Sequence, residues 1–146
     1  MVVPGLTPSI EFALLADAVQ AMNGKLFVLG GGWDTIWVRS FPARHHTMAI
    51  GTRLRIPWSS EPQTFELTVQ LVDEDGKPIF DTIRHSLTVA PPKGVPDGFE
   101  HGVVRAFTFN NVPFHQPGEY SFVMAIDGAE TGRLRFSVRE RRAELA

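Results

Sequence analysis

The sequence predicts an all-β protein, an antiparallel β-sandwich of about eight strands. Short runs in which apolar and polar residues alternate recur along the chain, and alternation with a period of two is what a half-buried strand requires. Turn residues separate these runs, with 13 glycines and 11 prolines in the chain. No long segment with helical spacing lies between them, which disfavours a parallel sheet with crossover helices.

The length of 146 residues suits a single domain. We expect one β-sandwich domain over residues 10–139, because all the alternating runs fall there. Residues 1–9 contain two prolines and no periodicity, so they are expected to form an extended arm. Residues 140–146 are rich in charge and are expected to form a tail.

Composition excludes several classes of function. The formal net charge of −2 argues against a nucleic-acid-binding protein, which would be strongly basic. The chain has no cysteine, so it has no disulfide, thiolate metal site or cysteine nucleophile. Its first residues lack the pattern of a signal peptide, and no apolar run is long enough to span a membrane. We therefore expect a soluble, cytoplasmic protein without a membrane or nucleic-acid partner.

The first part of the domain allows two interpretations. Phe12, Leu15, Val19 and Met22 lie near helical spacing. Asn23-Gly24, however, is the strongest short-range signal for a hairpin turn. We therefore expect a strand over Phe12–Ala18 that pairs with Leu26–Leu29.

The middle of the chain contains four further predicted strands. In the run from His46 to Trp58, apolar residues occupy one face while Arg53 and Arg55 occupy the other. Alternating runs follow at Phe65–Leu71 and Ile83–Val89, and then comes the long Pro/Gly-rich loop 90–98. Val103–Phe109 is apolar on both faces, which predicts a strand in the centre of a sheet.

Two strands, Tyr120–Ile126 and Leu134–Val138, complete the predicted sandwich. The first is entered through Pro117-Gly118-Glu119-Tyr120, and Tyr120 is the only tyrosine. This entry resembles the tyrosine corner of Greek-key sandwiches, in which the phenol bonds back to a nearby backbone group. We therefore expect a Greek-key sandwich of the immunoglobulin-like or C2-like type.

The stretch Gly30-Gly31-Gly32 separates two apolar runs. A phosphate-binding loop would need spaced glycines before a helix, commonly with a lysine, whereas a strand follows here. We interpret the glycines as a turn or bulge at which two backbones approach closely. Asp34 is expected to cap the bend by accepting hydrogen bonds from backbone amides.

Four residues are candidates for an interface or a ligand site: Trp33, Asp34, Trp37 and Trp58. Indole rings on a sandwich can stack on sugars or on a partner's side chains. Packing in the core or at an edge is the alternative for each of them, because an indole hides a large apolar area.

No catalytic residue, metal site or cofactor is predicted. Of the five histidines, the adjacent His45 and His46 would point to opposite faces of a strand and could not chelate one ion. Asp73-Glu74-Asp75 is interpreted as a solvated turn. The strand arginines, Arg53, Arg55, Arg133, Arg135 and Arg139, would form an anion-binding patch only if they shared a sheet, and protection of strand edges is the favoured interpretation.

Three motifs carry a resemblance to a known family: Ala13-Leu14-Leu15-Ala16-Asp17-Ala18, Gly24-Lys25-Leu26 and Leu29-Gly30-Gly31-Gly32-Trp33-Asp34. Over these residues the chain resembles an uncharacterised bacterial family of small β-rich domains of unknown function. The resemblance implies a compact β-rich domain. It implies no activity and no residue roles.

Three functions remain open on this basis. The first is a non-enzymatic interaction or assembly module that binds a protein partner, most simply a second copy of itself. The second is binding of a small ligand of the carbohydrate type by Trp33, Trp37 and Trp58. The third is an enzyme or metal protein that uses histidines from separate strands.

Overall fold

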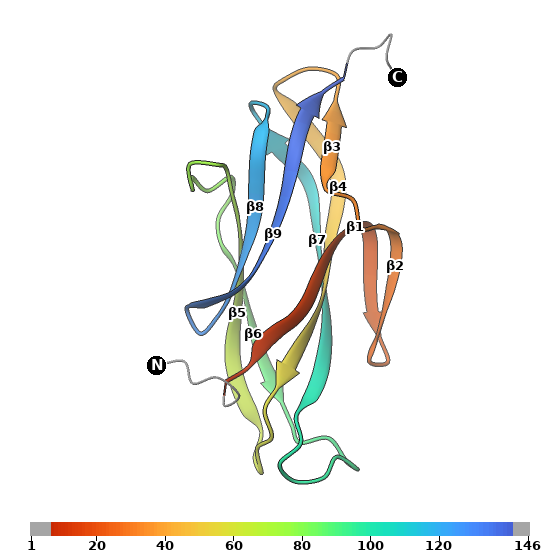
Figure 1. Ribbon diagram of the computed structural model, residues 1–146, viewed down its shortest axis with the longest axis vertical. Coiled ribbons are helices and arrows are strands. Elements are labelled where there is room, and N and C mark those ends of the chain that lie inside the picture. The colour runs from red at the N-terminus through yellow and green to blue at the C-terminus, as the bar shows by residue number, and fades with distance from the viewer. Residues whose placement is uncertain (1–6, 142–146) are drawn as a thin grey trace.

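The computed structural model describes residues 7–141, so most of the predicted arm 1–9 and tail 140–146 lies outside the described residues. The described residues form nine strands and no helix (Figure 1). The strands are β1 (Ser9–Met22), β2 (Lys25–Gly31), β3 (Thr35–Val38), β4 (Ala43–Ile56), β5 (Gln63–Val72), β6 (Ile83–Val89), β7 (His101–Phe114), β8 (Gly118–Ile126) and β9 (Ala129–Glu140). The predicted all-β class is confirmed, with one strand more than the expected eight. No helix between residues 7 and 141 could cross a bilayer.

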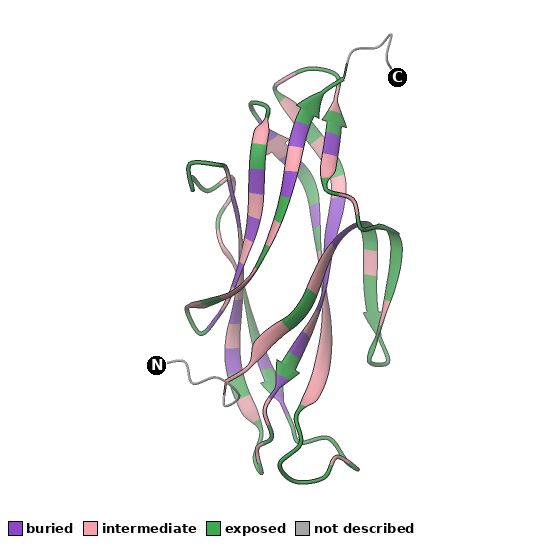
Figure 2. Ribbon diagram, viewed as in Figure 1, coloured by how far each residue is buried: buried purple, intermediate pink, exposed green. Residues whose placement is uncertain are grey.

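The strands form two sheets that face each other. One sheet has the order β2-β1-β4-β7, and the other has the order β3-β9-β8-β5-β6. All neighbouring strands are antiparallel except β3 and β9, which run parallel. Buried residues line the space between the sheets along the length of the molecule (Figure 2).

The core is built from the inward-facing residues of the long strands. On β4, Met48, Ile50, Leu54 and Ile56 are fully buried and face the other sheet. Aromatic rings in contact fill the middle of the core, where the tilted rings of Phe109 and Phe122 have centroids 4.9 Å apart. Burial of so many large side chains is the main source of stability for a sandwich of this size.

The hairpin predicted at Asn23-Gly24 is confirmed, and the helical alternative is wrong. Both turn residues have positive φ, 53° and 72°, as a tight hairpin turn requires. The register runs from Met22↔Lys25 to Ala16↔Gly31, so β2 pairs with the second half of β1. The first half, from Ser9 to Ala16, pairs with β4 instead. Most of the predicted strand Phe12–Ala18 therefore has a different partner from the expected one.

The β1–β2 hairpin folds back over the outer face of the four-stranded sheet. In Figure 1, β1 rises across the sheet, bends, and descends as one arm of the hairpin. Gly51 lies in β4 beneath it, and a Cβ there would be 3.1 Å from Cγ1 of Val19 and 3.4 Å from Cδ1 of Leu26. The hairpin thus packs on bare backbone, since no side chain stands at Gly51 to hold it away.

The prediction that Val103–Phe109 is a central strand is wrong, because β7 lies at the edge of its sheet. Its outward side is apolar for another reason. Val104 and Ala106 line a groove of about 610 Å³ whose opposite wall is the hairpin, residues 19–24. Periodicity alone cannot distinguish a central strand from an edge strand that a neighbouring hairpin partly covers.

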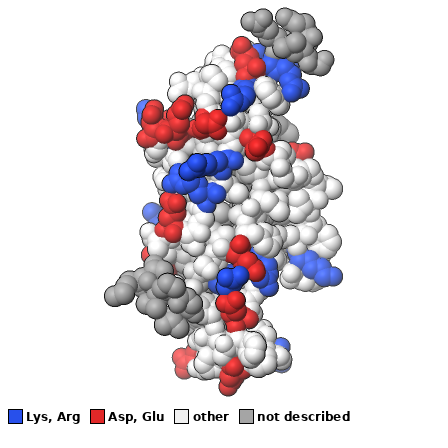
Figure 3. All heavy atoms as spheres, viewed as in Figure 1, with Lys and Arg blue, Asp and Glu red and all other residues white. Residues whose placement is uncertain are grey.

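The strand arginines do not form one basic patch. Arg53 and Arg55 lie on β4 in one sheet, while the other three lie on β9 in the second sheet. Both β4 arginines bond to Glu11, and Arg139 pairs with Glu119 at 3.2 Å. Basic and acidic side chains are accordingly interspersed over the face in Figure 3. An anion site built from these residues is therefore not supported.

Candidate functional site

The clearest candidate site is the exposed side of the β1–β2 hairpin. Four apolar side chains there are exposed to solvent: Met22 by 45%, Phe27 by 53%, Val28 by 38% and Leu29 by 73%. We call these four residues the hairpin patch. Figure 2 shows the hairpin as the most exposed pair of strands, and in Figure 3 that side of the molecule carries few charged atoms.

Strand register explains why the hairpin has one buried and one open face. The pairs Val19↔Val28 and Ala21↔Leu26 share the face that packs toward Gly51. The alternating pairs Gln20↔Phe27 and Ala18↔Leu29 therefore face solvent. Three of the four patch residues lie on the solvent face, and Val28 is partly exposed beside them at the sheet edge.

β2 is also a free sheet edge. Within residues 7–141 it pairs with β1 alone. Natural proteins usually protect such edges with charged residues, proline or bulges, because an unprotected edge can pair with another chain. Lys25 is the only charged residue in β2, which contains no proline, and its register with β1 shows no shift. An apolar edge strand of this kind is suited to β-strand addition.

The glycine triplet lies where β2 ends and the chain leaves its sheet. Gly30 has a φ of +60°, and a Cβ on it would meet the Asp17 carboxylate. Gly32 has a φ of +88°, and its N–H donates to Leu15 O at 2.8 Å. After Gly32 the chain crosses to the other sheet and continues as β3. The triplet is therefore a turn between sheets, and the constant register from Ala16 to Met22 contains no inserted bulge residue.

Trp33 and Asp34 follow the turn and make contacts within the fold. The Trp33 ring packs edge-on against His45 and Phe136, with centroid distances of 6.3 and 6.4 Å. Its indole nitrogen is buried. The Asp34 carboxylate accepts a hydrogen bond from the Thr35 hydroxyl at 3.0 Å, and the Asp34 backbone O accepts one from the Ser137 N–H. Neither residue is among those that line the cavities at Trp58 and beside β7. No backbone amide among the described residues donates a hydrogen bond to the Asp34 carboxylate, so the expected capping of the bend is not seen.

Trp37 lies on the edge strand β3 and is half exposed. Its ring is covered on one side by the Arg141 guanidinium, whose Cζ lies 4.5 Å from the ring centroid. This cation–π contact is the only interaction that the described residues show for its exposed ring.

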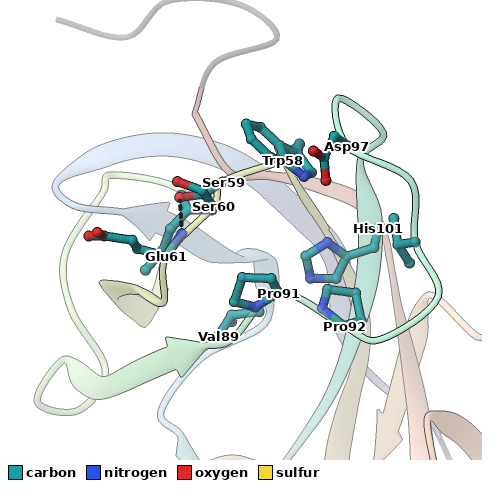
Figure 4. A pocket seen from close by; sticks show the side chains of 11 residues that line it. Trp58, Ser59, Ser60, Glu61, Val89, Pro91, Pro92, Asp97 and His101 are labelled. Carbon is teal, nitrogen blue, oxygen red and sulfur yellow. Dashed lines mark hydrogen bonds between the residues drawn. The ribbon is translucent and has the colours of Figure 1, made fainter.

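Trp58 lies at the opposite end of the sandwich. β4 begins beside Trp33, which packs on His45, and ends at Ile56, two residues before Trp58. A strand of this length spans roughly 40 Å. The structure therefore brings Trp33 near Trp37 but places Trp58 far from both. Trp58 lines a cavity of its own, shown in Figure 4.

The histidines are dispersed. In the described part of the chain, no three histidine, aspartate or glutamate side chains are grouped so that they could hold a metal ion. His45 is partly buried beneath Trp33, and this burial lowers its pKa below the ordinary value, while the nearby Asp17 carboxylate opposes the shift. A single neutral imidazole packed on an indole has a structural role.

Sequence reasoning overlooked the hairpin patch. The signal was present at Leu26-Phe27-Val28-Leu29, where four consecutive apolar residues leave no polar face to point at solvent. Such a run is typical of a strand buried on both sides. Only the three-dimensional structure shows that one side of β2 is open.

None of the curated proteins compared matches this chain. Two solved structures illustrate the similarity that is found. One is a Pseudomonas fluorescens alkylpurine DNA glycosylase, AlkC, bound to DNA containing an abasic site analog, with 12% identity, a TM-score of 0.49, and coverage of 90% of this chain and 30% of that one. The other is a beta-glucuronidase from glycoside hydrolase family 2, with 12% identity, a TM-score of 0.37, and coverage of 94% and 11%.

This chain therefore spans less than a third of either of those proteins, and the low scores carry no argument about function. A family model gives a clearer result. It matches residues 11–139, which include every strand of the sandwich in whole or in part. The chain belongs to a family of unknown function, DUF6941.

Proposed function

We propose that this protein is a non-enzymatic assembly module that associates with a second copy of itself through the free edge of β2. The observation that carries the proposal is the combination of an unpaired strand edge with the hairpin patch. Exposed apolar clusters on a small domain mark interaction surfaces, and strand addition would satisfy the free backbone groups of the edge.

The sequence of β2 suits pairing with itself. A two-fold axis through Val28 would place Phe27 opposite Leu29 of the second copy, and Leu29 opposite its Phe27. Lys25 would then lie opposite Gly31, so no like charges would meet across the axis. The two four-stranded sheets would join into one continuous sheet, with the solvent faces of both hairpins side by side.

The mass in solution tests this proposal. We expect a dimer by light scattering at high micromolar concentration, and a monomer for Leu29→Glu, because a carboxylate would oppose Phe27 of the second copy. Phe99→Glu is the matched control, since Phe99 is exposed by 63% but lies outside the hairpin, and this variant should stay dimeric. A monomeric wild type would overturn the proposal.

The register can be tested separately. In Phe27→Lys/Leu29→Glu, each lysine would face a glutamate of the second copy, and opposite charges at facing strand positions attract. This double variant should recover dimer that Leu29→Glu loses, whereas Phe27→Glu/Leu29→Glu should not. Equal behaviour of the two double variants would exclude pairing about Val28.

The grouping of three tryptophans that suggested carbohydrate binding is not found in the structure. Three tryptophans on one platform were expected to stack on sugar rings, but Trp33 packs near the start of β4 and Trp58 lies beyond its other end. Trp33 is packed against Phe136, and a cation covers one side of Trp37. No shared platform supports this function.

We also propose that the sandwich is of the Greek-key, immunoglobulin-like type. The hydrogen bond from the Tyr120 hydroxyl to Gln116 O, 2.6 Å long, supports this assignment, because it links the phenol to the loop that precedes its own strand. The parallel contact of the short edge strand β3 with β9 also supports it.

A further inference from the structure

A cavity of about 280 Å³ lies at the end of the sandwich opposite β3. It is formed where the chain leaves β4 and where the long loop 90–98 connects β6 to β7. Its walls include Trp58, Glu61, Pro91, Pro92, Asp97 and His101. The volume is suited to a group the size of an amino-acid side chain rather than to a large ligand.

The side chains in the cavity are arranged around one open space. In Figure 4 the Asp97 carboxylate lies beside the Trp58 indole, and the His101 ring lies between Trp58 and Pro92. Trp58 is 40% exposed, so part of its ring is open to a ligand. An open indole face and a nearby carboxylate together attract cations.

His101 adds an unsatisfied polar atom. Its Nε2 is buried and has no hydrogen-bond partner among residues 7–141. Buried polar atoms without a partner are rare because they lose their bond to water without replacement. Because this nitrogen is buried, an N–H group of a ligand in the cavity would reach it only after the His101 ring turns.

The charge of the walls has one sign. Glu61 and Asp97 both line the cavity, and neither forms an ion pair with another described residue. The described lining residues include no lysine or arginine. No lysine or arginine among these lining residues would therefore compete with a bound cation.

We infer that this cavity binds a small organic cation that carries N–H groups, a guanidinium or primary ammonium group. The cation would lie against the Trp58 ring and be balanced by the Asp97 carboxylate beside it, and a turn of the His101 ring would let Nε2 accept a hydrogen bond as well. A free amine or an arginine or lysine side chain of a protein could supply this group. The inference goes beyond self-association and does not depend on it.

Nuclear magnetic resonance of the three tryptophan indole N–H groups tests this inference, with Trp58→Phe identifying the Trp58 signal. Addition of N-acetylarginine amide should shift the Trp58 signal saturably and leave the Trp37 signal in place. The citrulline analogue, which has nearly the same shape without the charge, should bind at least about tenfold more weakly. Comparison of the affinities of agmatine, N-acetyllysine amide and N-acetylarginine amide distinguishes the two sources of the cation. Tighter binding of agmatine would indicate a free amine, and tighter binding of a blocked amino acid would indicate a side chain.

Variants assign the roles of the walls. Asp97→Asn should weaken binding by about tenfold, since it removes a charge-assisted contact. Asp75→Asn, which changes an exposed carboxylate outside the cavity, should leave binding unchanged. The same titration on monomeric Leu29→Glu separates this site from the hairpin, because the cation should bind there equally well.

Three results would overturn the inference. One is a Trp58 signal that none of the cations shifts. Another is equal binding of the citrulline and arginine compounds, which would show that charge is irrelevant. The last is a saturable shift with N-acetylglucosamine but not with the cations, which would identify a sugar site instead.

Discussion

Val19 lies directly over Gly51, so that the β1–β2 hairpin rests on the backbone of β4. A Cβ at Gly51 would lie 3.1 Å from Val19 Cγ1, closer than ordinary van der Waals contact. Val19 and Gly51 are not paired in the sheet, so their close approach shows that the hairpin bends over β4 at this point. This bend also determines which face of β2 is open to a partner.

Gly51→Val should lift the hairpin away from the sheet. The added methyl groups would overlap Val19 and Leu26, and overpacking of this kind typically costs about 1–3 kcal/mol. We expect a lower free energy of unfolding in urea. Faster amide hydrogen exchange should be concentrated in residues 19–28, while the core strands β5 and β8 remain protected.

A double-mutant cycle provides the control. Val19→Ala removes the methyl groups nearest Gly51, so Gly51→Ala should cost less in that background than in the wild type. Independent, additive costs would show that Val19 and Gly51 are not in contact.

The Tyr120 phenol should titrate above its ordinary value of about 10. Burial raises the pKa of Tyr120, and the carboxylates of Asp73 and Glu74 raise it further. Because Tyr120 is the only tyrosine, ultraviolet absorbance of the phenolate reports this group alone. The midpoint should be above 10 in the folded protein and return to about 10 in concentrated urea.

The same shift makes stability depend on alkaline pH. As the pH rises above about 10, the unfolded chain releases the phenol proton before the folded chain does. The free energy of unfolding should therefore fall from about pH 10 up to the raised pKa of Tyr120 in the folded state. Tyr120→Phe should abolish this dependence. At neutral pH it should cost about 1 kcal/mol, because the 2.6 Å bond to Gln116 O is lost. An unchanged alkaline profile in Tyr120→Phe would contradict the assignment.

Local rules predicted much of the fold. Asn23-Gly24 identified its turn because positive φ is needed at both positions, and the alternation from Met48 to Ile56 identified the core face of β4. The position of β7 could not be obtained in this way. Its outward apolar residues face the hairpin across a groove, and that arrangement depends on the bend in β1 and on the space at Gly51.

The candidate site was harder to predict than the fold. Trp33 and Trp37 drew attention as large aromatic residues, yet one packs on the core and the other carries Arg141 on its ring. Exposure of Phe27 and Leu29 depends on β2 having no neighbour on its second edge. Which strands pair is decided by contacts between residues far apart in sequence. The residue pattern of one strand therefore cannot show that a neighbouring strand is absent from one of its edges.

His45 should make the protein less stable in mild acid. Burial lowers the pKa of His45 below its ordinary value of 6.5, so the folded state favours the neutral imidazole. The stability that neutral His45 contributes is therefore complete above about pH 6.5. It is lost as the pH falls through the lowered pKa of His45 in the folded state. Urea unfolding measured from pH 7.5 to pH 5 should show this decline.

His45→Phe separates titration from packing, since a phenyl ring can still pack edge-on against Trp33. The variant should have a smaller decline in the free energy of unfolding over the same pH range. A decline as steep as that of the wild type would show that other groups cause it.

Gly31→Val should destabilise the turn through close contact rather than through backbone strain. Gly31 does not have the positive φ of Gly30 and Gly32, but a Cβ on it would lie 2.6 Å from Val28 Cγ1. Val28 is β-branched and cannot easily turn away, so we expect a loss of about 1–3 kcal/mol in the free energy of unfolding.

Gly32→Ala is the control for backbone strain, because a Cβ added there would meet open space while the φ of +88° disfavours any side chain. Its cost should be about 1 kcal/mol, set by the left-handed backbone alone. Replacing Val28 with alanine should rescue Gly31→Val but not Gly32→Ala, since only the first contains the side-chain overlap. Rescue of both variants, or of neither, would show that contact with Val28 is not why glycine stands at position 31.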